Sequence, residues 1–184
     1  MVRDLNSKTP LKPASFAHFV LRVTNLKASI RFYEELLGMH VVHEAGFIAF
    51  MTYDSEHHRI ALVATPVTDP SPAGAAGLDH VAYTFSSLEA LLGSYLRLKA
   101  ADILPVWSIN HGPTTSLYYA DPDGNRIELQ VDNFDNEKQA QDFMDSTTFA
   151  QNPIGVEFDP DKLVQRFLAG DSLEELKRQG ATDN

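Results

Sequence analysis

The sequence of 184 residues contains no cysteine. Disulfide bonds, zinc fingers, iron–sulfur clusters and catalysis by a thiol are therefore excluded. No run of about 18 apolar residues is present, so no membrane span is predicted. The N-terminal segment MVRDLNSKTPLKP lacks the apolar stretch of a signal peptide, so we expect a cytoplasmic protein.

Basic residues are few, with 15 Lys and Arg against 25 Asp and Glu, and the formal net charge is -10. Such a surface repels phosphate backbones and anionic membrane faces, so we expect neither a nucleic-acid partner nor a membrane partner. Hydrophobic residues make up 43% of the chain and charged residues 22%, which is ordinary for a globular protein with a buried core. The acidity says nothing against a small buried ligand.

A pattern of strand, helix and three strands occurs twice along the chain. In the first copy the strands are expected at 16–23, 40–42, 46–53 and 58–65, and the helix at 26–38. A linker rich in Pro, Gly and Ala follows at 66–78. In the second copy the strands are expected at 78–85, 103–109, 116–120 and 125–131, and the helix at 86–100, with Ser86 and Glu89 as a capping box.

The repeat predicts an α+β fold in which two βαβββ modules, residues 15–66 and 77–133, pair into one cupped metal site. Residues 1–14 are expected to form an N-terminal arm. Residues 134–184 are expected to form a helical C-terminal extension, with helices opening at Asp159–Pro160 and after Ser172. This extension is interpreted as a lid, a packing arm or a dimer contact, and the chain as a possible homo-oligomer.

Equivalent positions of the two copies suggest a metal site. His18 and His80 occupy the same position of the two first strands, and Glu128 lies in the last strand of the second copy. Two imidazoles and one carboxylate form the triad that binds non-heme Fe(II) and leaves three coordination positions open. The position that matches Glu128 in the first copy is Ala61, which cannot bind a metal. A structural histidine in a strand, or a solvent-facing Glu128, is the competing interpretation.

Four segments carry a family resemblance: HFVLRV, FYEELLGM, LDHVAY and YYADPDGNRIELQ. With them, residues 16–133 resemble the vicinal oxygen chelate superfamily, which includes glyoxalases, bleomycin resistance proteins and extradiol dioxygenases. The segment HGPTTSLYYADPDGNRIE is more closely similar to the signature of one-domain extradiol catechol dioxygenases of the biphenyl-2,3-diol 1,2-dioxygenase type. The resemblance implies an enzyme of aromatic catabolism that cleaves an aromatic diol with O₂. It implies Fe(II) as the cofactor, and the same triad can hold Mn(II).

The resemblance also implies roles for three other residues. It places the family's active-site tyrosine on Tyr118. It places on His111 a catalytic histidine that lies just outside the metal ligands. It places the acid/base histidine on His58, and the neighbouring His57 is the alternative. A histidine titrates near neutral pH and can accept and return a proton.

Two other functions are compatible with the same fold. Glyoxalase- or epimerase-like enzymes use a fourth protein ligand, and Ala61 at that position counts against them. A non-catalytic binding protein lacks the metal triad. An apolar substrate pocket is predicted from Val20, Phe47, Met51 and Trp107, and a bicyclic catechol such as 2,3-dihydroxybiphenyl is one candidate substrate.

Overall fold

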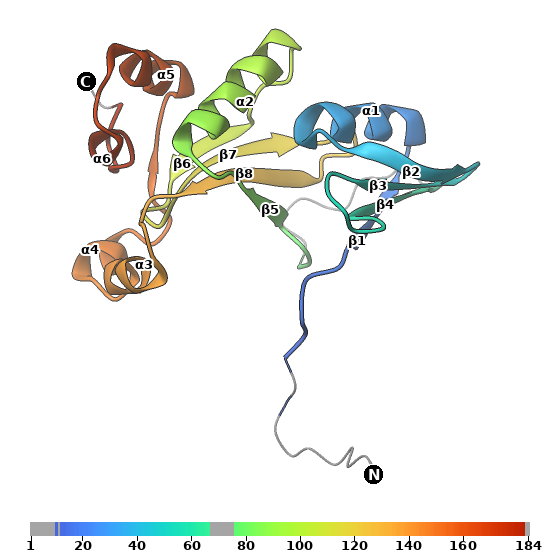
Figure 1. Ribbon diagram of the computed structural model, residues 1–184, viewed down its shortest axis with the longest axis horizontal. Coiled ribbons are helices and arrows are strands. Elements are labelled where there is room, and N and C mark those ends of the chain that lie inside the picture. The colour runs from blue at the N-terminus through green and yellow to red at the C-terminus, as the bar shows by residue number, and fades with distance from the viewer. Residues whose placement is uncertain (1–9, 11, 67–75, 183–184) are drawn as a thin grey trace. The chain divides into compact units, whose positions relative to one another are not determined.

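The computed structural model describes residues 10, 12–66 and 76–182. Most of the predicted N-terminal arm, and residues 67–75 of the predicted linker, lie outside the described residues. The chain divides into two compact units, Met1–Thr68 and Asp69–Asn184, which are described separately below (Figure 1).

The first unit is a four-stranded sheet with one helix. Its elements in chain order are β1 (Phe19–Val23), α1 (Leu26–Leu37), β2 (His40–Ala45), β3 (Ile48–Thr52) and β4 (Ile60–Ala64). The spatial order is β1-β4-β3-β2, and β1 runs parallel to β4 while the other neighbours are antiparallel.

Helix α1 has a side-chain cap at its first turn and a glycine at its C-terminal end. The Asn25 side chain accepts a hydrogen bond from the Ala28 amide at its start, and Gly38 ends it in the left-handed conformation at φ 62°. Ile30, Tyr33 and Leu36 are buried on one helical face, and α1 contacts β3 and β4. The helix therefore covers one face of the sheet and leaves the other face for the predicted site residues.

The second unit repeats this module and adds a fifth strand. Its first elements are β5 (His80–Thr84), α2 (Leu88–Ala100), β6 (Trp107–Asn110), β7 (Thr114–Ala120) and β8 (Arg126–Asp132). The spatial order is β5-β8-β7-β6-β9. The N-cap of α2 is Ser87, whose side chain accepts from the Ala90 amide, so the predicted cap at Ser86 is one residue too early and its capping box with Glu89 is wrong. The backbone of Ser87 is extended, and this conformation lets its side-chain oxygen reach the Ala90 amide.

The C-terminal extension contains α3 (Glu137–Met144), α4 (Thr147–Gln151), β9 (Val156–Glu157), α5 (Pro160–Ala169) and α6 (Leu173–Leu176). Helix α5 starts after Asp159 and α6 starts with a capping box of Ser172 and Glu175, as the sequence predicts. Helices α3 and α4 and strand β9 were not predicted. The extension is largely helical and also contains the two-residue β9, which is stabilised by pairing with β6 rather than by any local pattern.

The predicted α+β fold with two βαβββ modules is confirmed. Each sheet has one face covered by the helix of its own module, α1 or α2 (Figure 1). Within the described part of the chain, no helix has both the length and the apolar character needed to cross a membrane.

Candidate functional site

Strand register aligns several polar and aromatic side chains on one face of the second sheet. Glu128 on β8 is paired with Ala82 on β5 and with Tyr118 on β7, and Tyr118 is paired with Trp107 on β6. Directly opposed residues point to the same face of a sheet. The neighbouring residues Tyr119 and Leu129 point to the opposite face, and both are fully buried. The face that α2 does not cover thus carries the candidate site.

His80 and Glu128 converge on this face. The distance from His80 Nε2 to Glu128 Oε2 is 3.1 Å, and Glu128 is only 4% exposed. The other imidazole nitrogen, Nδ1, lies 2.7 Å from Asp79 Oδ2. That hydrogen bond holds the pKa of Asp79 below its usual range, and the nearby Arg126 lowers it further. Because the Asp79 carboxylate hydrogen-bonds Nδ1, the Nε2 atom of His80 is directed at Glu128. The same arrangement is found around metal-binding histidines.

Tyr118 and His111 form a second pair next to Glu128. Tyr118 is 2% exposed, and its hydroxyl lies 3.0 Å from His111 Nε2. His111 Nε2 is 4.0 Å from Glu128 Oε1. Burial raises the pKa of Tyr118 strongly, and the negative charge of Glu128 raises it further. The phenol therefore keeps its proton at neutral pH and can serve as a hydrogen-bond donor.

An aromatic and cationic wall adjoins Tyr118. The ring centroids of Trp107 and Tyr118 are 4.9 Å apart. The Arg126 guanidinium lies 4.8 Å from the Tyr118 centroid and 5.3 Å from that of Trp107, within the range of cation–π attraction. Trp107 Nε1 donates to Glu157 Oε1 at 2.7 Å. Arg126 and Glu157 were not predicted as site residues: Arg126 stands out in sequence only as a repeat match, and Glu157 has no local signal.

The first unit gathers three histidines next to β1 and β4. The ring centroids of His18 and His58 are 4.2 Å apart, and His57 Nδ1 is 2.6 Å from His58 Nδ1. Phe50 lies edge-on to His58 at 4.9 Å between centroids. Burial lowers the pKa of His58, and the positive charges of His18 and His57 lower it further. His58 is therefore neutral near pH 7, which is the form that accepts a proton.

The two sheets have the same register at the positions that the repeat relates. Ala61 on β4 is paired with Val20 on β1 and with Phe50 on β3, as Glu128 is paired with Ala82 and Tyr118 in the second sheet. Where the second sheet presents a carboxylate, the first presents a methyl group. The first unit therefore offers no side-chain ligand at this equivalent position.

The predicted apolar pocket needs one correction. Met51 is fully buried, whereas Val20 is 54% exposed and Phe47 is 64% exposed. Phe50, the residue before Met51 in β3, is paired with Ala61 of β4, and Ala61 is paired with Val20 of β1. Successive residues of a strand face opposite sides, so Met51 belongs to the core under α1 and Phe50 takes its place on the site face.

The donors that converge on the second sheet, an imidazole and a carboxylate, are of types that bind divalent metal ions. A buried carboxylate is almost never left without a cation, and Glu128 has imidazole nitrogens as its partners. Imidazole and carboxylate donors suit Fe and Mn ions. In residues 12–66 and 76–182, no three His, Cys, Asp or Glu side chains are grouped so as to hold a metal. The second unit supplies two of the three predicted ligands, and the assignment of His18 remains a prediction from the repeat.

Comparison with known proteins adds close relatives. The model of the Glyoxalase/Bleomycin resistance protein/Dioxygenase superfamily matches residues 15–129. Biphenyl-2,3-diol 1,2-dioxygenase 2 of Rhodococcus globerulus is 44% identical over 162 residues, which cover 88% of this chain and 85% of that protein. Biphenyl-2,3-diol 1,2-dioxygenase 3 of the same organism is 42% identical over 163 residues, with 87% and 85% covered.

Solved structures share the fold at lower identity. The glyoxylase/bleomycin resistance protein/dioxygenase domain from Frankia sp. EAN1pec has a TM-score of 0.58 and 20% identity, covering 70% of this chain and 98% of that one. Lactoylglutathione lyase from Agrobacterium tumefaciens has a TM-score of 0.52 and 21% identity, covering 65% and 94%. The matching family model and the two relatives above 40% identity show that the chain belongs to the Glyoxalase/Bleomycin resistance protein/Dioxygenase superfamily.

Proposed function

We propose that this protein is an Fe(II)-dependent extradiol dioxygenase, which uses O₂ to open a catechol ring next to its two hydroxyl groups. The observation that carries the proposal is the convergence of His80 Nε2 and Glu128 Oε2 at 3.1 Å beside the buried Tyr118 hydroxyl. The names of the two Rhodococcus relatives support the reaction class, because a 1,2-cleavage of a 2,3-diol breaks the ring outside the diol.

The proposed metal ligands are His18, His80 and Glu128. Three protein ligands leave three positions of a six-coordinate ion open, and Ala61 adds no fourth donor at the repeated position. Bound Fe(II) would supply the coordination positions and the electrons through which a catechol and O₂ react together. Asp79 would hold the imidazole of His80 in the orientation that ligation requires.

The other residues of the site would handle protons and orient the substrate. Tyr118 keeps its proton, so its hydroxyl would donate to a substrate oxygen, with His111 Nε2 as its present acceptor. His58 is neutral and would accept a substrate proton and return it to the ring-opened product. These are the roles that the sequence resemblance implies for the same residues.

An aromatic diol is the proposed substrate class. The wall of Trp107, Tyr118 and Arg126 offers ring faces and a cation against which an electron-rich ring can stack. Both Rhodococcus relatives are named for a biphenyl diol. We therefore propose 2,3-dihydroxybiphenyl as the first substrate to test.

The test is oxygen uptake by protein reconstituted anaerobically with Fe(II), against 2,3-dihydroxybiphenyl, catechol and methylcatechols. Expected is uptake of one O₂ per diol together with a yellow ring-opened product. A parallel reconstitution with Mn(II) distinguishes the two candidate metals. Iron-loaded protein that consumes no O₂ with any diol would overturn the proposal.

Glu128→Ala tests the metal site in the same assay. Removing a buried carboxylate that ligates the metal should abolish both iron retention and O₂ uptake. Glu44→Ala, which removes an exposed glutamate of β2, is the control and should retain both. Full iron occupancy in Glu128→Ala would contradict the ligand assignment, even if the wild-type protein proved to be a dioxygenase.

A further inference from the structure

The C-terminal extension adds a strand to the edge of the second sheet beside the site. Val156 and Glu157 of β9 pair antiparallel with Asn110 and Ile109 of β6. The Phe158 amide donates to the Ser108 carbonyl at 3.1 Å and continues the ladder. The extension thus lies alongside β6, the strand that carries Trp107 and leads directly into His111.

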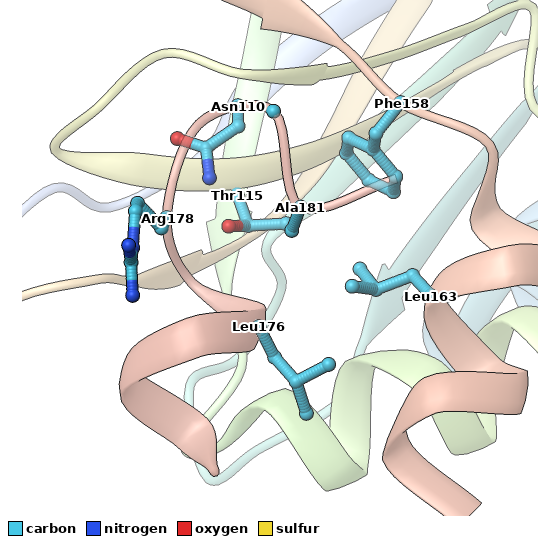
Figure 2. Close-up of a pocket in the computed structure, with 8 residues that line it drawn as sticks. Asn110, Thr115, Phe158, Leu163, Leu176, Arg178 and Ala181 are labelled. Atoms are coloured by element: carbon cyan, nitrogen blue, oxygen red, sulfur yellow. The ribbon is translucent and has the colours of Figure 1, made fainter. Parts of the chain in front are cut away.

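Further contacts hold the extension in this place. The Asn110 side chain, 3% exposed, donates to the Lys177 carbonyl at 2.8 Å, and Gln179 Nε2 donates to the Asn110 carbonyl at 3.0 Å. In Figure 2, the extension side chains Phe158, Leu163, Leu176 and Ala181 surround a small cavity over Asn110 and Thr115. The segment beside the site is therefore anchored at its C-terminal side by packing and hydrogen bonds.

Two atoms of the extension contact predicted site residues. His111 Nδ1 lies 2.5 Å from the Ile154 carbonyl oxygen, and the Glu157 carboxylate accepts from Trp107 Nε1. A carbonyl oxygen can only accept a hydrogen bond, so His111 Nδ1 carries the hydrogen. In the neutral ring Nε2 is then an acceptor that faces the Tyr118 hydroxyl 3.0 Å away, and the Glu128 carboxylate is a second acceptor for the same hydroxyl.

We propose that residues 152–157, the positioning segment, fix the orientation and the tautomer of His111 and through it the direction of the Tyr118 hydroxyl. His111 with its hydrogen on Nε2 would instead donate to the Tyr118 oxygen, and the Tyr118 hydrogen would then point away from His111. The importance of that hydroxyl for turnover rests on the proposed dioxygenase function. The tautomer itself does not depend on that function.

Gly155 shows how closely the positioning segment approaches β6. Its φ is +116°, and a Cβ there would lie 2.3 Å from the Asn110 carbonyl oxygen and 2.8 Å from His111 Cα. These are backbone atoms that cannot move aside, so Gly155→Ala must push the segment away from His111. Asn152 holds the turn from the other side, because its side chain accepts from the Gly155 amide at 3.1 Å and donates to the Gly155 carbonyl at 2.7 Å.

The experiment compares Gly155→Ala with Gly170→Ala. Gly170 also has a positive φ, +90°, and lies in the same extension, but a Cβ there meets no atom within 4 Å. Backbone strain is thus common to both variants, and displacement of the segment is specific to Gly155→Ala. Nitrogen-15 NMR of the imidazoles in the metal-free proteins, with the His111 signals identified by their loss in His111→Gln, reports the tautomer directly.

Wild type and Gly170→Ala should show the Nδ1–H tautomer of His111, and Gly155→Ala should show a mixture or the Nε2–H form. Asn152→Ala, a milder change, should shift the tautomer in the same direction if Gly155→Ala does not fold. An Nε2–H tautomer in the wild type, or an unchanged tautomer in the folded Gly155→Ala protein, would overturn the proposal. Wild-type protein with the Nδ1–H tautomer and no activity toward any diol would instead count against the dioxygenase function alone.

Discussion

Replacing Tyr118 by Phe separates the role of the hydroxyl from the role of the ring. The ring stacks on Trp107 with centroids 4.9 Å apart and lies under Arg126, and Phe preserves both contacts. Only the oxygen 3.0 Å from His111 Nε2 is lost. A net hydrogen bond contributes about 0.5–1.5 kcal/mol, so the free energy of unfolding should fall by about 1 kcal/mol.

The catalytic effect should be larger than the effect on stability. If the hydroxyl donates to a substrate oxygen on which charge develops, its loss should lower kcat by about 100-fold. Iron occupancy should stay at the wild-type level, because Tyr118 is not a proposed ligand. Urea unfolding of the metal-free protein, iron content and steady-state O₂ uptake measure the three quantities.

Tyr119→Phe is the matched control on the same strand. Tyr119 is fully buried on the opposite face of the sheet, and its hydroxyl has no hydrogen-bond partner among the described residues. Removing an unsatisfied buried hydroxyl relieves a desolvation cost of about 1–3 kcal/mol, so the variant should be as stable as wild type or more stable, with wild-type kcat. A Tyr118→Phe enzyme with wild-type kcat, or equal losses of kcat in both variants, would refute the assignment of Tyr118.

Two further variants test a proton acceptor and a contact of the extension. His58→Gln keeps a polar side chain of similar length but cannot accept a proton, so kcat should fall by about 100-fold or more with iron retained; wild-type turnover would rule out the acid/base role. Asp161→Asn removes the carboxylate that accepts from Lys99 and Tyr95 and thereby joins α5 to α2. The hydrogen bond from Lys99 holds the pKa of Asp161 below the ordinary value of an aspartate, so its stabilising contribution is present above that ordinary value and is lost as the pH falls through the folded-state pKa. The urea midpoint of wild type should exceed that of Asp161→Asn at neutral pH, and the gap should close on acidification; a gap that does not change with pH would contradict the linkage.

Repetition in the sequence was sufficient to predict the two modules and their equivalent positions. Strand pairing is governed by local alternation and by the length of the connecting turns, and both recur in the two copies. The predicted match of Ala61 with Glu128 therefore reappears as identical register in the two sheets. Short capping and turn signals at Asn25, Gly38 and Asp159 predicted helix ends for the same local reason.

The sequence alone could not predict contacts between distant segments. Ile154 reaches His111 across 43 residues and Glu157 reaches Trp107 across 50, and no local periodicity encodes either pairing. Strand β9 has only two residues, too few to show an alternating pattern, and exists because β6 offers unpaired backbone groups. The fold class and the three proposed metal ligands thus followed from sequence spacing, and the roles of Tyr118, His111 and His58 from a family resemblance. The support of His111 and Trp107 by the extension depends on three-dimensional proximity.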